Sequence, residues 1–229
     1  MAEFDALFFD MDGTLVENSS LMPAAFNQGF AEAGYEISID PWRGSGRTDY
    51  EILDIYLGDF GLTGEQKELV KEEIAANIRK IVIGKVEENG LKALPGVVEL
   101  IAKLNELEIY PGLLTGNMEV IVTPKLKAAG MKREDFLYGG FGDHSTCRAD
   151  TARKALESAS AFLGHKADPE RCLVIGDTPN DIACARAIGA KVLAVATGRF
   201  STKDLQEYEP DFLLPDLTDL PAFLRIIGA

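Results

Sequence analysis

The sequence predicts an α/β protein with a doubly wound, Rossmann-like parallel sheet and an inserted helical domain. Short apolar runs alternate with segments of helical periodicity, which is the order of a parallel sheet. The runs are apolar throughout rather than at every second residue, as expected for strands buried on both faces. The stretch from residue 17 to residue 88 contains no convincing strand-like run, which indicates that it is an insertion.

Six short apolar runs are the predicted strands of the sheet. They cover residues 6–9, 110–115, 172–176, 191–197 and 211–215, with 136–141 as a weaker candidate. Helical patterns lie between them at 96–107, 119–130, 151–164 and 180–190. The second of these helices ends at Gly130, a plausible C-terminal cap, and contains Pro124, which either kinks the helix or marks its true start.

The inserted region shows helical patterns at 23–34 and 65–82 on either side of a glycine-rich turn at 42–53. We therefore expect a core domain made of residues 1–16 and 89–229 and a helical cap domain made of residues 17–88. The insertion follows the first strand directly, so the cap should lie over the strand ends, where open α/β sheets bind ligands.

Composition narrows the functional classes. The chain of 229 residues is 46% hydrophobic, which argues against global disorder, and its formal net charge of -14 disfavours nucleic-acid binding. The three cysteines show no CxxC spacing, so a disulfide framework or zinc knuckle is not expected. The N-terminus does not read as a signal peptide and no run suits a membrane span, so we expect a cytoplasmic protein.

Three strand ends carry unusual polar residues, in the motifs DMDGT, LLTGN and GDTPND. Parallel strands bring these motifs to one edge of the sheet, where four carboxylates would gather: Asp10, Asp12, Asp177 and Asp181. Their mutual repulsion requires a compensating charge, and a hard divalent cation such as Mg²⁺, completed by a phosphate of the substrate, supplies it. Taken singly, each motif also has a simpler interpretation as a turn or as a cap of the next helix.

In this order and spacing the three motifs resemble those of the haloacid dehalogenase superfamily, and in particular its phosphoglycolate phosphatase-like branch with a helical cap. The resemblance covers essentially the whole chain. It implies that Asp10 is the nucleophile, that Asp12 is the general acid and then the general base, and that Gly13 allows a tight turn beneath the phosphate. It also implies that Thr115, the Gly116 amide and Asn117 hold phosphoryl oxygens.

The same resemblance implies a Mg²⁺ site formed by the Asp10 carboxylate, the Asp12 backbone carbonyl and Asp177, with Asp181 as a direct or water-mediated ligand. The family also places a basic residue beside the nucleophile, often in a Lys-Pro pair, and no such pair occurs between the second and third motifs. We assign this role to Arg148, with Arg153 and Lys154 as the alternatives.

The predicted function is a Mg²⁺-dependent phosphatase that hydrolyses a small phosphomonoester such as phosphoglycolate through an aspartyl-phosphate. The alternatives are a sugar-phosphate phosphomutase of the β-phosphoglucomutase type and a non-catalytic phosphate-binding scaffold. Arg47, in the glycine-rich turn, is a candidate for binding the substrate's non-reacting end, although a solvent-exposed arginine is nearly as well supported. We interpret Trp42 as a packing residue of the cap and His144 as structural or exposed, and expect a monomer or homodimer.

Overall fold

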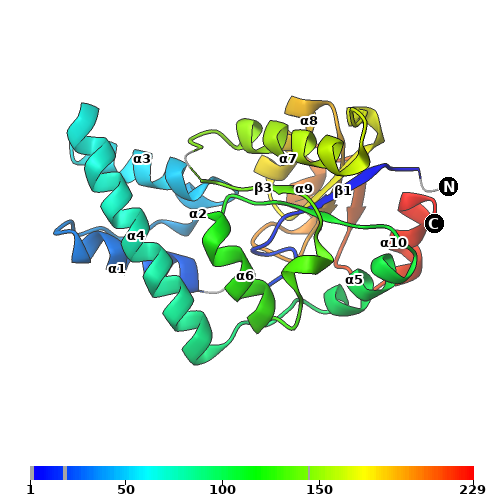
Figure 1. Cartoon of the computed structure of the whole chain (residues 1–229), viewed down its shortest axis with the longest axis horizontal. Coiled ribbons are helices and arrows are strands. Elements are labelled where there is room, and N and C mark those ends of the chain that lie inside the picture. Colours follow the sequence, from blue (N-terminus) through cyan, green and yellow to red (C-terminus); the bar gives the residue numbers. More distant parts are fainter. Residues whose placement is uncertain (1–2, 18–19, 144) are drawn as a thin grey trace.

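The fold is built around a six-stranded sheet in a computed structural model that describes residues 3–17, 20–143 and 145–229 (Figure 1). All strand pairs are parallel and the spatial order is β3-β2-β1-β4-β5-β6. The strands are β1 (Ala6–Phe9), β2 (Gly112–Leu114), β3 (Gly139–Gly140), β4 (Cys172–Gly176), β5 (Lys191–Val195) and β6 (Phe212–Leu214). The order reverses direction at β1, which places the topological switch point beside this strand.

Helices surround the sheet and connect its successive strands. The α-helices are α1 (Leu21–Glu32), α2 (Pro41–Gly44), α3 (Asp49–Asp59), α4 (Gly64–Asn89), α5 (Val97–Glu106), α6 (Glu119–Ala128), α7 (Arg148–Leu163), α8 (Pro179–Ile188), α9 (Thr202–Gln206) and α10 (Leu220–Ile227). Two short 3₁₀ helices, η1 (Arg133–Asp135) and η2 (Pro169–Arg171), precede β3 and β4.

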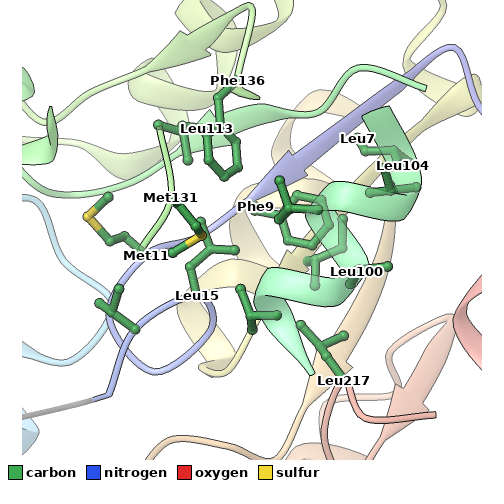
Figure 2. Packing of buried hydrophobic residues seen from close by; sticks show 14 of the residues in the cluster. Leu7, Phe9, Met11, Leu15, Leu100, Leu104, Leu113, Met131, Phe136 and Leu217 are labelled. Carbon is green, nitrogen blue, oxygen red and sulfur yellow. The ribbon is translucent and has the colours of Figure 1, made fainter. Parts of the chain in front are cut away.

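The central strand β1 is buried on both faces, which explains its unbroken apolar sequence. Leu7 and Phe9 pack into the core formed with α5, α6 and α10, part of which Figure 2 shows. Ala6 and Phe8 point to the opposite face and pack against small residues of α7 and α8. Alternate residues of one strand therefore anchor helices on both sides of the sheet.

Helices α1 to α4, which we call the helical segment, lie together on one side of the sheet region (Figure 1). They share a separate hydrophobic cluster whose members include Phe26, Phe30, Leu53 and Ile78. Met118 and Ile121, at the start of α6, join the same cluster, so the helical segment also packs directly against the core.

The structure confirms the predicted fold class, and each predicted strand region contains a strand. The glycine-rich turn is shorter than predicted, because Thr48 caps a helix that begins at Asp49. Helix α6 continues through Pro124 rather than starting there. The domain boundaries at 16–17 and 88–89 remain a prediction. Among the described residues, no helix combines the length and apolar character needed to cross a membrane.

Candidate active site

The three polar motifs meet at the carboxyl edge of the sheet. Asp10 follows β1, Thr115 follows β2 and Asp177 follows β4. Both β2 and β4 are immediate neighbours of β1 in the sheet. The Asp10 amide continues the β1–β4 ladder by donating to the Ile175 carbonyl at 2.9 Å. Asp10, Asp12, Thr115, Gly116, Asn117 and Arg148 all line one pocket. The strand register therefore collects residues that lie far apart in the sequence.

Gly13 forms a tight turn under this edge with a φ of +93°, a conformation that favours glycine. A side chain at this position would collide with the Asp177 carboxylate. The Gly13 amide donates to the Val16 carbonyl at 2.8 Å, and its carbonyl accepts from the Thr197 hydroxyl at 2.5 Å. The described lining of the pocket does not include Gly13, so the structure shows it shaping the turn rather than facing the cavity.

Arg148 is buried among carboxylates. Its Nη2 donates to Asp10 Oδ1 at 2.7 Å and also to Asp181 Oδ1. Its Nη1 donates to the Gly46 carbonyl at 3.1 Å, in the loop between α2 and α3. One planar guanidinium therefore joins the nucleophile candidate, the third motif and the helical segment, which suits the fixed fork of arginine donors.

Asp10, Asp177 and Asp181 offer carboxylate oxygens within 4.8 Å of one another, all on buried residues. Asp177 Oδ2 is buried and has no hydrogen-bond partner among the described residues, although Oδ1 accepts from Thr14 at 3.3 Å. A buried carboxylate oxygen without a donor is costly, and a cation would satisfy it. The all-oxygen donor set suits Mg²⁺, so the residues present fit the predicted ion.

The electrostatics of this group show the same deficit of positive charge. Burial raises the pKa of Asp10 to about 7, and the neighbouring Asp181 adds to the rise while Arg148 opposes it. Burial also raises the pKa of Asp177 well above its usual range, reinforced by the charges of Asp10 and Asp181. One arginine therefore does not compensate the three carboxylates.

Asp181 also helps to cap helix α8, which is the simpler interpretation that the third motif has on its own. Its Oδ2 accepts from the Thr178 amide at 3.0 Å and the Thr178 hydroxyl at 2.7 Å, forming a capping box at the start of α8. Because its other oxygen accepts from Arg148, both oxygens already have protein donors. Asp177 is therefore the carboxylate with the freer oxygen for a metal.

A second cation, Lys125 of α6, holds Asp12. Its Nζ lies 2.5 and 2.6 Å from the two carboxylate oxygens of Asp12 and 2.6 Å from Asn117 Oδ1. The three ammonium donors thus have three acceptors. The Lys125 side chain is fully buried, whereas that of Asp12 is 27% exposed. The Asp12 carboxylate consequently faces Lys125 and does not belong to the three-carboxylate group.

The second motif connects the site to the helical segment. The Gly116 carbonyl accepts from the Asp49 amide at 2.8 Å, and Asp49 Oδ2 accepts from the Met118 amide at 2.8 Å. A side chain at Gly116 would overlap the Arg47 carbonyl, so glycine is needed for this close approach. The Thr115 hydroxyl accepts from the Asn117 amide at 3.2 Å. The loop before α3 is therefore seated directly on the second motif.

Arg47 lines the pocket, but its guanidinium donates to the Arg43 carbonyl and to Glu51.

Trp42 is not packed inside the helical segment, so its interpretation as a packing residue of the cap is wrong. Its side chain is 61% exposed, and its ring lies 5.6 Å from the ring of Phe200 in the core. Aromatic contact with the core therefore occurs where helix α2 approaches the segment after β5.

Comparison with known proteins agrees with this geometry. A family model described as haloacid dehalogenase-like hydrolase matches residues 4–189, which include all three motifs. This chain belongs to that family. The family match confirms the predicted hydrolytic enzyme, and the phosphatase names of several relatives agree with the predicted phosphatase.

Two relatives align with nearly all of the chain. Pyrophosphatase PpaX from Oceanobacillus iheyensis is 23% identical over 97% of this chain and 96% of that protein. Phosphoglycolate phosphatase from Agrobacterium fabrum is 26% identical over 93% of this chain and 88% of that protein. A solved hydrolase from Pseudomonas syringae has the same fold, with a TM-score of 0.76 at 21% identity over 98% and 99% of the two chains.

Among the basic candidates, only Arg148 lies beside Asp10. Arg153 is exposed and pairs with Asp150, and Lys154 is also exposed on α7.

Lys125 was not among the sequence candidates, although a signal existed: it falls on the buried face of α6 with Ile121 and Val122. A lysine at an apolar position of an amphipathic helix needs a buried partner. His144 lies outside the described residues.

Proposed function

We propose that this hydrolase is a Mg²⁺-dependent phosphatase that cleaves small phosphomonoesters of the phosphoglycolate type through an aspartyl-phosphate. The observation that carries the proposal is the Asp10 carboxylate, which lies in the pocket, next to Arg148 and the partnerless oxygen of Asp177. A nucleophile and a fixed cation that line the pocket, with an oxygen-rich carboxylate group beside them, are the parts that phosphoryl transfer requires.

In the proposed reaction a carboxylate oxygen of Asp10 attacks phosphorus, and the bond from phosphorus to the ester oxygen breaks. Asp12 gives a proton to the departing alkoxide, then accepts one from the water that attacks the aspartyl-phosphate and releases inorganic phosphate. Lys125 and Asn117 would keep the Asp12 carboxyl in place for both transfers. Arg148 would hold Asp10 in its attacking position.

Thr115, Gly116 and Asn117 line the pocket and would contact the phosphoryl oxygens. Asp10, Asp177 and the Asp12 backbone carbonyl would hold Mg²⁺, with Asp181 as an additional direct or water-mediated ligand. When bound, the ion would supply positive charge that stabilises the negative charge of the phosphoryl group. The helical segment, proposed as a cap domain, would exclude water from the cavity that it shares with the core.

Inorganic phosphate release from a panel of small phosphomonoesters and pyrophosphate, measured with and without Mg²⁺, tests this function. We expect Mg²⁺-dependent release by the wild-type enzyme and none above background by Asp10→Asn. Release that survives this substitution undiminished would refute the Asp10 mechanism. Conversion of a sugar phosphate into its isomer without phosphate release would instead identify a phosphomutase.

A further inference from the structure

Three arginines line the pocket, and two of them are already committed to protein acceptors. Arg148 donates to Asp10, Asp181 and the Gly46 carbonyl. Arg47 donates to Glu51 and the Arg43 carbonyl. In a chain with a net charge of -14, the third pocket arginine therefore carries the positive charge available to a ligand.

That third residue is Arg199, which follows β5 at the same sheet edge as the other site residues. Its guanidinium lies 5.9 Å from the centre of the Trp42 ring, and no carboxylate of the described residues lies within ion-pair distance of it. A guanidinium packed over an indole ring keeps its edge of N–H donors available, and that edge matches a carboxylate or phosphate.

The part of the pocket lining that the helical segment contributes is mainly apolar. Its apolar members are Met22, Pro23, Phe26, Ile39, Pro41 and Ile52. At the reacting end, Asp10, Asp12 and Asp49 line the same pocket and would repel any second anionic group of a substrate. The charge distribution thus separates a place for the reacting phosphate from a place for another anion.

We propose that Arg199, oriented by Trp42, binds a second anionic group of the substrate at the pocket mouth. The substrate class is a phosphomonoester whose alcohol carries a carboxylate or second phosphate beyond an uncharged, largely apolar stretch. This inference rests on the proposed phosphatase function and replaces Arg47 with Arg199 as the cation that selects the non-reacting end. Trp42 acts as a positioning residue for Arg199.

The kinetic test compares Arg199→Ala with wild type on three matched series: carboxyalkyl phosphates of increasing chain length, beginning with phosphoglycolate, alkanediol bisphosphates, and neutral alkyl phosphates. We expect kcat/KM to fall about tenfold for doubly anionic substrates of the preferred length and less than about twofold for neutral ones. The series with the larger loss identifies the anion as carboxylate or phosphate. Arg199→Lys should recover part of the loss, because it retains the charge without the fork.

The matched control is Lys203→Ala, which removes one exposed positive charge from α9 outside the pocket lining. It should leave the discrimination between anionic and neutral esters unchanged. An equal loss on anionic and neutral series in Arg199→Ala, or no loss on either, would overturn the assignment.

Binding can be measured independently of turnover, because Trp42 is the only tryptophan of the chain. In the Asp10→Asn background, Trp42 fluorescence should report a Kd for a carboxyalkyl phosphate that rises about tenfold when Arg199→Ala is added. The Kd for an alkyl phosphate, obtained by calorimetry, should not change. If wild type hydrolyses no ester, the proposed function fails, while this titration still decides whether Arg199 binds the second anion.

Discussion

The aspartates of the first motif lie two residues apart, but each contacts a different cation in a different environment. Arg148 serves Asp10 within a buried group that also contains Asp177 and Asp181. Lys125 contacts Asp12 alone among the carboxylates, with Asn117 completing its donors. The first cluster has more carboxylates than cations, whereas the second is balanced. We infer that only the first depends on a metal for its charge balance.

The largest expected effect separates the chemical roles of the two aspartates. Asp10→Asn removes the proposed attacking oxygen and should lower kcat by about 10⁴-fold or more. Asp12→Asn removes the group that we propose transfers protons, and it should lower kcat by about 10²- to 10⁴-fold. Quenched-flow detection of acid-stable phosphoenzyme from a radiolabelled ester should show none with Asp10→Asn. Substrates with a good leaving group, such as an aryl phosphate, should recover part of the activity in Asp12→Asn only.

An equal recovery by the aryl phosphate in both variants would contradict this division of roles. Circular dichroism of each variant provides the control for folding, since both changes are nearly isosteric.

The next effect tests the uncompensated charge around Arg148. Arg148→Met would leave the buried carboxylates of Asp10 and Asp181 without their shared donor, and we expect a loss of about 4 kcal/mol in the free energy of unfolding without metal. Mg²⁺ should restore more stability to this variant than it adds to wild type, because a bound ion replaces the missing charge. Urea unfolding with and without Mg²⁺ measures both quantities. Destabilisation unaffected by Mg²⁺ would contradict a metal site in this cluster.

Lys125→Met is the matched variant for the balanced cluster. It keeps an unbranched side chain of similar size on α6 but leaves Asp12 and Asn117 without their donor. We expect a loss of about 3 kcal/mol, smaller than for Arg148→Met because Asp12 is partly exposed to water. Mg²⁺ should not restore stability here, and the same urea titrations check this. A restoration equal to that of Arg148→Met would show that the two clusters share one charge deficit.

The two clusters also differ in how far their residues could be predicted from the sequence. The Asp10, Thr115 and Asp177 positions follow from strands that end at one sheet edge, a regularity visible in the apolar runs. Arg148 could also be predicted as the basic residue beside Asp10, because it lies in the short segment before a predicted helix. The partner of Lys125 could not be predicted, because Asp12 lies 113 residues away and only the packing of α6 brings the two side chains together. Arg199 was missed for the same reason, because its position depends on the loop after β5 meeting α2.

A third carboxyl, Asp49, extends the comparison because it lies in the same pocket without a cation of its own. Its described partner is the Met118 amide, and burial raises its pKa to about 7, with the nearby charge of Lys125 opposing the rise. The folded state therefore binds this proton more tightly than the unfolded chain, whose Asp titrates near 4. The stability contributed by protonated Asp49 is complete below pH 4 and is lost as pH rises through 7.

Asp49→Asn keeps an oxygen that accepts from the Met118 amide but cannot ionise. The excess of its free energy of unfolding over that of wild type should grow by about 2 kcal/mol between pH 5 and pH 7, because only wild type must ionise or retain a buried proton as the pH rises. Urea unfolding of both proteins in the same metal-free buffers measures this difference, and the contributions of Asp10 and Asp177 cancel between them. Parallel pH profiles would show that Asp49 is already compensated, and that Lys125 serves both Asp12 and Asp49 rather than Asp12 alone.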